Sequence, residues 1–282
     1  MSFSSIFARM VAWIGAAAIL ARRFNEPQRA PVYGGTPEIP PARPQSIPTL
    51  KMPTARGWSE GQTPVAAKGL KVNAFAKGLR HPRWIHVLPN GDVLVAEALS
   101  VPGPVKTAFD YAIVSTMRRA AAVGESPNLI TLLRDADGDG VAEVRETLLE
   151  GLNQPFGMAL IGSTLYVGNT DGVYAFPYTE GTTRITAPGK KLMNTPPGGH
   201  WTRSLLASAD GKKLYVGVGS DSNIGENGMA AEQGRAAIHE LDLETGNSRI
   251  FAGGLRNPVG LAFEPSTGGL WTVVNERDGL GD

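Results

Sequence analysis

The sequence predicts an all-β protein of the six-bladed β-propeller type, with about four blades present in the chain. Three observations lead to this class. A unit that opens with Gly-Leu-x-x-Pro recurs at Gly78–Pro82, Gly151–Pro155 and Gly254–Pro258. Each unit continues as an apolar strand, a turn and a second strand. Glycine and proline number 35 and 21 of 282 residues, which is typical of a chain with many short strands and turns.

The units have the composition of β-hairpins. An apolar strand runs to a turn such as Asn90-Gly91 or Asp210-Gly211, and a second apolar strand follows. Tight hairpin turns favour these dipeptides because the turns need positive φ. A third strand is expected at 172–176 and at 237–242, and a further unit opens at 198–200. Recurrence at roughly 45–60 residues favours propeller blades over a single sandwich.

The interval between the first two units is longer than the others. Residues 105–123 read VKTAFDYAIVSTMRRAAAV, with apolar residues at helical spacing and many strong helix formers. We expect a helix here, inserted into the first blade and lying on one rim. Packing against the blade is its simplest role.

The bulk composition limits the classes of function. The net charge is +1, which gives no reason to expect a nucleic acid partner. Hydrophobic residues make up 42% and charged residues 19%, so the chain can bury a core. There is no cysteine, which excludes disulfides and thiol catalysis.

The N-terminal part of the chain differs from the rest. Residues 10–21 are apolar and uncharged, and two arginines follow. The stretch is shorter than the ~20 residues of a transmembrane helix and fits the apolar region of a secretory signal. We expect a hydrophobic helix in 1–24 that serves as a signal peptide or membrane anchor, a proline-rich linker in 25–67 and the partial propeller in 68–282. The protein is then periplasmic, exported or anchored to the inner membrane. A buried amphipathic helix is the alternative.

Polar side chains gather where the units open. Propellers bind ligands on the face where the innermost strands begin, so these side chains are expected to converge. Their convergence indicates a site more strongly than any one of them does. The residues are Arg83, Trp84, Gln154, His200, Arg203, Arg256 and Asn257.

Several segments resemble the soluble aldose and sorbosone dehydrogenases that depend on pyrroloquinoline quinone (PQQ). They are GHWTRSL at 199–205, GLRNPVGLAF at 254–263 and VNERDGLGD at 274–282. The segment LLRDADGDG at 132–140, preceded by the helical insertion, is typical of the L-sorbosone dehydrogenase branch. The resemblance runs from about residue 72 to the C-terminus. It implies a propeller that oxidises a sugar or an aldehyde with PQQ and calcium and passes electrons to a cytochrome or quinone.

The resemblance assigns roles to the matching residues. His200 matches the general base that takes the proton of the substrate hydroxyl while a hydride passes to PQQ; an imidazole can do this near neutral pH. Arg256 and Asn257 match a pair that contacts PQQ, and a planar guanidinium suits quinone oxygens or a carboxylate. Gln154 matches a further cofactor contact, and Arg203 is a cofactor-binding candidate beside His200.

The resemblance also implies a calcium ion held against PQQ by the loop that ends the sequence. Glu276, Asp278 and Asp282 are the candidate ligands in this loop, because carboxylates suit a hard cation. The metal would polarise the quinone as a Lewis acid. Ordinary surface charges are the alternative.

The sequence departs from the family pattern in two ways. Members often carry an acidic residue before the catalytic histidine, where this chain has Gly199. The family also has further blades, which supply basic residues for the PQQ carboxylates and close the ring. We therefore expect a C-terminally truncated fragment with little PQQ-dependent activity of its own.

A second acidic segment fits a calcium loop. Asp135, Asp137, Asp139 and Glu146 stand at positions one, three, five and twelve of the EF-hand pattern, with glycine at six. The flanks read as strands rather than helices. The segment is thus expected to be a β-hairpin turn that either binds calcium structurally or is a solvated Asp-Gly turn.

Two other functions remain open at this stage. A propeller lactonase or related hydrolase would use calcium without PQQ, and it would need several Asn, Asp or Glu side chains around one metal. The units here open with Arg, Gln and His, which favours an anionic planar cofactor. A propeller that only displays a binding surface is the third class.

Overall fold

The computed structural model describes residues 53–277. The hydrophobic segment 1–24, most of the proline-rich linker, and Asp278 and Asp282 lie outside these residues. The described part of the linker, 53–67, forms no helix or strand and is almost entirely exposed. Within residues 53–277, no helix has the length and apolar character needed to cross a membrane.

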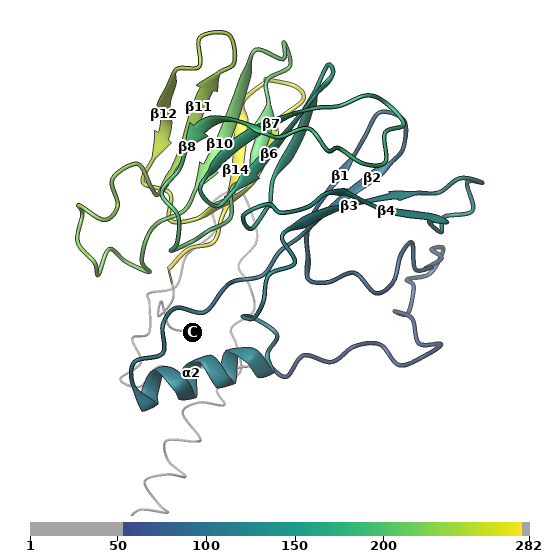
Figure 1. Ribbon diagram of the computed structural model, residues 1–282, viewed down its shortest axis with the longest axis horizontal. Coiled ribbons are helices and arrows are strands. Elements are labelled where there is room, and N and C mark those ends of the chain that lie inside the picture. The colour runs from purple at the N-terminus through teal and green to yellow at the C-terminus, as the bar shows by residue number, and fades with distance from the viewer. Residues whose placement is uncertain (1–52, 278–282) are drawn as a thin grey trace, which may run out of the picture. The chain divides into compact units, whose positions relative to one another are not determined.

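Three antiparallel sheets of four strands follow one another along the chain, and a two-stranded sheet comes last (Figure 1). The first sheet consists of β1 (Pro82–Val87), β2 (Val93–Glu97), β3 (Leu129–Arg134) and β4 (Val144–Leu149). The second consists of β5 (Met158–Ile161), β6 (Thr164–Asn169), β7 (Gly172–Pro177) and β8 (Lys190–Asn194). The third consists of β9 (Leu205–Ala207), β10 (Lys213–Val218), β11 (Ala237–Asp242) and β12 (Ser248–Gly253), and the last of β13 (Pro258–Phe263) and β14 (Leu270–Val274).

Each sheet is a meander in which strands pair in chain order. The first strands of successive sheets lie beside each other, β5 against β9 and β9 against β13. This arrangement of four-stranded meanders around a common inner edge is propeller-like. The prediction of an all-β chain built from repeating hairpin units is confirmed, and a ring of six blades stays a prediction.

Two apolar clusters join the sheets. The first lies between the first and second sheets, where Leu94, Ile130 and Leu132 meet Leu165 and Val167. The second joins the second and third sheets; its members include Val173, Leu214, Val216 and Leu241. The alternation of apolar and polar residues along the strands thus places one apolar row on the face that the next sheet covers.

The predicted helical insertion is present as α2 (Ala108–Arg119), between β2 and β3. Thr107 and Asp110 form a capping box: Asp110 N donates to Thr107 Oγ1 at 3.1 Å, and Thr107 N donates to the Asp110 carboxylate at 2.8 Å. Arg118 and Arg119 stand in the last turn, where positive charge is favoured. In Figure 1 the helix lies away from the sheets, and Ser100 and Val123 bridge the two ends of the insertion.

A buried ion pair fixes the first hairpin. The β1–β2 turn contains Gly91 at a φ of +88°, which an Asn-Gly turn requires. The next residue, Asp92, is buried and accepts two hydrogen bonds from Arg134 on β3, at 2.6 and 2.7 Å, and one from Asn90 at 2.9 Å. The turn is thereby tied to the third strand.

We expect Asp92→Asn to lower the free energy of unfolding by about 2 kcal/mol, because it breaks a bidentate pair in which only Arg134 is partly exposed. The hydrogen bonds from Arg134 hold the pKa of the Asp92 carboxyl below its usual range. The stabilisation is therefore complete above about pH 4 and is lost as pH falls through the lowered pKa. Urea unfolding of both proteins between pH 3 and 7 measures this. A difference that stays constant down to pH 3 would contradict it.

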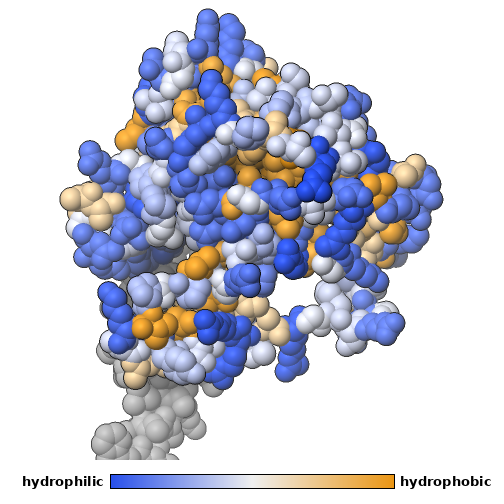
Figure 2. All heavy atoms as spheres, in the orientation of Figure 1, coloured by the Kyte–Doolittle hydropathy of each residue, from blue (hydrophilic) through white to orange (hydrophobic). Residues whose placement is uncertain are grey.

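The surface is largely hydrophilic, with apolar side chains in separate patches (Figure 2). Among the described residues, four large apolar side chains on β1 and β14 are more than half exposed. Ile85 and Val87 are 63% and 61% exposed, and Trp271 and Val273 are 68% and 70% exposed. These strands belong to the first and the last sheet, so an apolar face is uncovered at each end of the array.

Candidate functional site

Two segments that open successive units, those of His200 and Arg256, meet at Ser220, which follows β10. The Ser220 carbonyl accepts hydrogen bonds from the backbone N–H of His200, at 3.0 Å, and from its ring. The Ser220 N–H donates to the carbonyl of Arg256 at 2.7 Å. The predicted convergence of the unit openings is thus present for His200 and Arg256, although they are far apart in the sequence.

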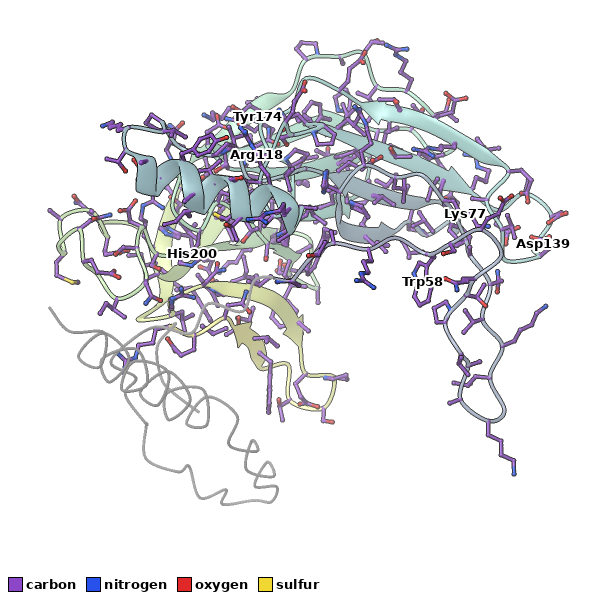
Figure 3. All side chains as sticks on the ribbon, turned by 90° about the horizontal axis from the view of Figure 1, so that it is seen from below. Trp58, Lys77, Arg118, Asp139, Tyr174 and His200 are labelled. Carbon is purple, nitrogen blue, oxygen red and sulfur yellow. The ribbon has the colours of Figure 1, made fainter. Side chains whose placement is uncertain are left out.

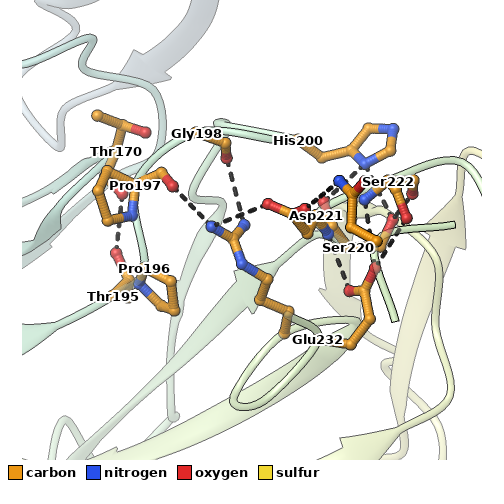
Figure 4. A network of polar contacts seen from close by, with 12 residues as sticks. Thr170, Thr195, Pro196, Pro197, Gly198, His200, Ser220, Asp221, Ser222 and Glu232 are labelled. Atoms are coloured by element: carbon orange, nitrogen blue, oxygen red, sulfur yellow. Dashed lines mark hydrogen bonds and ion pairs between the residues drawn. The ribbon is translucent and has the colours of Figure 1, made fainter. Parts of the chain in front are cut away.

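The hydrogen bonds of His200 define its tautomer. Its Nδ1 lies 2.9 Å from the Ser220 carbonyl and 3.0 Å from Ser220 Oγ. The Ser220 hydroxyl donates its own proton to the carbonyl of Ser222 at 2.6 Å, so toward the ring its oxygen is an acceptor. With two acceptors facing it, Nδ1 carries the proton and Nε2 keeps its lone pair. Figure 4 shows the ring turned with this second nitrogen away from the network.

Asn257 and His200 both lie against Gly219. A Cβ placed on Gly219 would fall 2.4 Å from His200 Cβ and 2.5 Å from Asn257 Oδ1, so glycine is needed for the two side chains to come this close. Asn257 is 7% exposed, and its Oδ1 is buried without a hydrogen-bond partner among the described residues. A buried carboxamide oxygen of this kind is unusual and indicates a place for a donor.

Arg256 organises the loops around this pair. Its Nε and Nη2 donate to the carbonyl and side-chain oxygens of Asn223, at 3.0 and 2.8 Å. Its Nη1 donates to the carbonyls of Asn275 and Glu276, at 3.1 and 2.8 Å. The guanidinium therefore holds the start of the segment that was predicted to bind calcium. The Glu276 carboxylate is exposed and caps the N–H of Arg277 at 2.9 Å.

Arg203 is completely buried beneath the loop that carries His200. Nη1 donates to the carbonyl of His200 at 2.7 Å and to that of Thr202 at 3.0 Å, Nε to Thr195 Oγ1 at 3.1 Å, and Nη2 to the carbonyl of Pro196. Burial lowers the pKa of this guanidinium to about 9, so it stays protonated at neutral pH. All these bonds go to residues 195–202. The geometry gives Arg203 a place under the His200 loop and does not favour the predicted cofactor contact.

A second set of charged residues around His200 was missed by the sequence reasoning. Buried Arg235 donates to the carbonyls of Pro197 and Gly198, at 2.6 and 3.2 Å, and lies 3.7 Å from the Asp221 carboxylate (Figure 4). Glu232 accepts from the N–H groups of Asp221 and Ser222. The residues come from the long β10–β11 connection, which contains no recognisable motif, so only their contacts reveal them.

The structure explains why glycine, and not an acidic residue, stands at position 199 just before His200. Its φ is +56°, and a Cβ there would lie 2.7 Å from the Asp221 backbone. A side chain at this position would therefore collide with the β10–β11 connection. The β10–β11 connection instead contributes the carboxylates of Asp221 and Glu232 to the polar network around His200.

Gln154 is placed at the opening of the second sheet with a φ of +48°. Its Nε2 donates to the carbonyl of Leu99 at 2.9 Å, and its N–H donates to Asn128 Oδ1 at 3.0 Å. The side chain thus ties the second sheet to the chain that follows β2. Its predicted contact with a cofactor stays a prediction.

An aromatic cluster lies where the sheets open. Phe156 packs against Trp84 and Trp201, with ring centroids 5.1 and 6.3 Å apart. Arg83 lies over the Trp201 ring at 5.4 Å, and Trp201 Nε1 donates to Ser100 Oγ at 2.6 Å. Both tryptophans therefore pack against Phe156. Trp201 follows His200 in the chain and Val259 lies two residues after Asn257, so the cluster packs beside the site.

The second acidic segment forms the β3–β4 turn, and both flanks are strands as predicted. Ligand atoms of Asp135, Asp137, Asp139 and Glu143 lie within 4.8 Å of one another. Glu146 is instead an exposed residue of β4 opposite Leu132, so Glu143 is the fourth carboxylate that the turn brings in. Figure 3 shows Asp139 far from His200, which separates this cluster from the His200 site.

The family model described as TrAA12-like matches residues 121–281. The match begins just after α2 and includes His200, Asn257 and the acidic β3–β4 turn. The predicted relationship to PQQ-dependent sugar dehydrogenases is confirmed by this match together with the relatives below.

Individual relatives are identical to the chain at about a quarter of the aligned positions. A PQQ-dependent sugar dehydrogenase of Hypocrea jecorina (strain QM6a) is 26% identical over 233 residues, which is 77% of this chain and 48% of the relative. The calcium structure of the Trichoderma reesei carbohydrate-active enzyme of family AA12 is 25% identical, with a TM-score of 0.60, over 76% of this chain and 51% of that one.

The holo PQQ domain of pyranose dehydrogenase from Coprinopsis cinerea is 21% identical, with a TM-score of 0.57, over 75% of this chain and 48% of that one. This likeness concerns the fold alone. The chain spans about half the length of the relatives it matches.

Proposed function

Because the chain belongs to the TrAA12-like family, we propose that it supplies the catalytic base and part of the cofactor site of a dehydrogenase that oxidises a sugar or a related aldehyde with PQQ and calcium. The observation that carries this proposal is that His200 Nδ1 lies within hydrogen-bond distance of two oxygens of Ser220. A histidine that donates through Nδ1 and keeps the Nε2 lone pair is arranged as a general base.

The residues next to His200 suit a planar, oxygen-rich cofactor. The Asn257 carboxamide has a buried oxygen without a partner, which can accept from an N–H or O–H group, and its amide group can donate to a quinone oxygen. Gly219 leaves space where any other side chain would intrude. His200 and Asn257 would therefore face the cofactor. Arg256 would add positive charge at the edge and fix the loop that follows.

In this reaction the protein would remove the substrate proton and hold the His200 ring in position. PQQ, when bound, supplies the acceptor for the hydride that leaves the substrate carbon. His200 Nε2 would take the proton of the substrate hydroxyl, because Ser220 keeps the other ring proton on Nδ1. Arg203 donates to the His200 carbonyl and so fixes the backbone that carries the imidazole ring. The aromatic cluster around Phe156 would exclude water from one side of the site.

Calcium has two candidate places in this proposal. One is the loop at the end of the sequence, where Glu276, Asp278 and Asp282 would be ligands near the cofactor. The other is the β3–β4 turn, where Asp135, Asp137 and Asp139 would hold a structural ion, with Glu143 in place of Glu146. Carboxylate oxygens are suitable ligands in both places.

Calorimetric titration of the chain with calcium tests the β3–β4 turn. We expect binding at about 10⁻⁴ M, as for exposed extracellular sites. Asp137→Ala and Glu143→Gln should remove it, whereas Glu146→Gln, the matched control on β4, should leave it unchanged. Equal binding by the Asp137→Ala variant would show that the turn is only a solvated Asp-Gly turn.

The six-bladed ring is also part of the proposal. The exposed faces around Ile85 and Trp271 resemble the faces that the clusters between the sheets bury, and an apolar sheet face left in water favours association. We propose that further sheets cover both faces in the whole protein. We also propose that residues 1–24 direct export to the periplasm or anchor the protein to the inner membrane. A cytochrome or quinone would accept the electrons.

One experiment distinguishes the function classes. PQQ and calcium are added to the whole protein, the PQQ absorbance is recorded, and dye reduction is followed with aldoses and sorbosone. The proposal expects a spectral change and sugar-dependent dye reduction. Lactone hydrolysis without PQQ would instead favour a calcium-dependent hydrolase, and neither activity would favour a binding scaffold.

A further inference from the structure

The β10–β11 connection, residues 219–236, folds back on itself through a series of turns. The Gly228 N–H donates to the Gly225 carbonyl at 2.9 Å, and the Glu232 N–H donates to the Met229 carbonyl at 3.2 Å. Gly225 and Gly228 have φ values of +82° and +84°, which glycine adopts without strain. These turns return Glu232 to the beginning of the connection, next to the residues that follow β10.

The half-buried carboxylate of Glu232 accepts three hydrogen bonds from this beginning (Figure 4). Its Oε2 accepts from the Asp221 N–H at 2.8 Å. Its Oε1 accepts from the Ser222 N–H and from the Ser222 hydroxyl, both at 3.2 Å. An ionised carboxylate has only acceptors, so it can take all three donors at once. Glu232 therefore fixes the backbone at 221–222.

The backbone that Glu232 fixes decides how the Ser220 hydroxyl is turned. Ser220 is 5% exposed, and its hydroxyl donates to the Ser222 carbonyl at 2.6 Å. A hydroxyl has one proton, so the Ser220 oxygen can then only accept from His200 Nδ1, which lies 3.0 Å away. A series of bonds thus leads from Glu232 through Ser222 and Ser220 to the nitrogen of His200 that carries the proton.

We propose that Glu232 is a positioning residue for His200. By holding the Ser222 backbone it keeps the Ser220 hydroxyl turned as an acceptor, and so keeps His200 Nε2 free of a proton. The catalytic consequence rests on the proposed function, because a general base needs that bare nitrogen. Glutamine cannot replace Glu232, because one carboxylate oxygen becomes an NH₂ group that meets a backbone N–H with a second donor.

The test is ¹⁵N NMR of the histidine ring nitrogens in the full chain, without PQQ or calcium, at about pH 8.5, where an ordinary imidazole is neutral. The His200→Gln variant assigns the His200 signals. We expect a protonated Nδ1 and a bare Nε2 in the wild type. In Glu232→Gln the Nε2 signal should move at least about a tenth of the way to its protonated value, since one lost hydrogen bond changes the tautomer ratio about fivefold. Glu232→Ala should move it in the same direction, which keeps the test open if Glu232→Gln folds poorly.

Glu264→Gln is the matched control. The Glu264 carboxylate caps the Ser266 N–H at 2.9 Å and the Thr267 N–H and hydroxyl at 2.6 Å, all within the β13–β14 turn. This variant should lose stability in urea as Glu232→Gln does, but it should leave the His200 signals unchanged.

Turnover of the whole protein with PQQ and calcium gives a second measurement. Glu232→Gln should lower kcat by about threefold and keep KM within about twofold, as expected when only the transition state is affected. Unchanged His200 signals in both Glu232 variants, or an equal change in Glu264→Gln, would overturn the proposal and leave Glu232 a structural cap. A wild type with its proton on Nε2 would overturn the assignment of His200 as the base as well.

Discussion

Replacing His200 by alanine is expected to lower turnover of sugar by about 10²–10⁴-fold, the range that loss of a general base causes. The physical reason is the lone pair on Nε2. The Ser220 carbonyl and Oγ both accept from Nδ1, so the ring is held in the tautomer that can receive a proton. Dye reduction by the whole protein, with PQQ and calcium at saturation, measures the effect on kcat.

Two further variants make this result specific. His239→Gln is the matched control, because His239 is a half-buried histidine of β11 whose Nε2 lies 2.9 Å from the Gly234 carbonyl. The His239→Gln variant should keep kcat within about twofold of the wild type, since His239 Nε2 is already hydrogen-bonded to a carbonyl. Ser220→Ala removes one of the two acceptors and should lower kcat less than His200→Ala does. If His200→Ala kept the kcat of the wild type, His200 would not be the base.

Replacing Arg203 by methionine is expected to lower the free energy of unfolding by about 3 kcal/mol, because buried acceptors lose their donor. The carbonyls of Pro196, His200 and Thr202 would then have no guanidinium beneath them. The His200 loop should loosen first. Urea denaturation of the chain gives the stability, and hydrogen exchange at residues 195–202 gives the local effect.

The alternative for Arg203 is the direct cofactor contact that the sequence predicted. In that case Arg203→Met would weaken PQQ binding while the urea midpoint stayed unchanged. Arg83→Met is the matched control, since Arg83 is an exposed arginine that stacks on Trp201; its loss should cost no more than about 1 kcal/mol. Equal destabilisation by both substitutions would contradict the supporting role of Arg203.

Local signals in the sequence predicted the elements well. The Asn-Gly turn before β2, the apolar runs of the strands and the helical spacing in 105–123 each depend on residues close in the chain, and each is present. The acidic β3–β4 segment was read as a hairpin turn because its flanks alternate like strands. The choice of Glu146 as its last carboxylate followed the helical calcium-loop pattern, whereas a strand begins at Val144 and leaves Glu143 in the turn.

The candidate site was predictable only in part. The openings of the units identify His200 and Asn257, because every propeller unit starts on the same face. Burial could not be foreseen: Arg203 and Arg256 look alike as cationic residues, yet one lies beneath the loop and the other joins three loops at the edge. Ser220, Glu232 and Arg235 stand in a connection without periodicity, so no pattern points to them.

The sequence by itself determined the repeating strand units, the inserted helix and the histidine that faces the site, since these follow from short-range periodicity and turn chemistry. Only the tertiary structure decided which polar groups form hydrogen bonds within the protein. Whether a side chain meets a carbonyl depends on segments far away along the chain, as with Ser220 and His200. The same packing leaves the carboxamide oxygen of Asn257 beside His200 without a partner, and this residue lies where we expect the cofactor to bind.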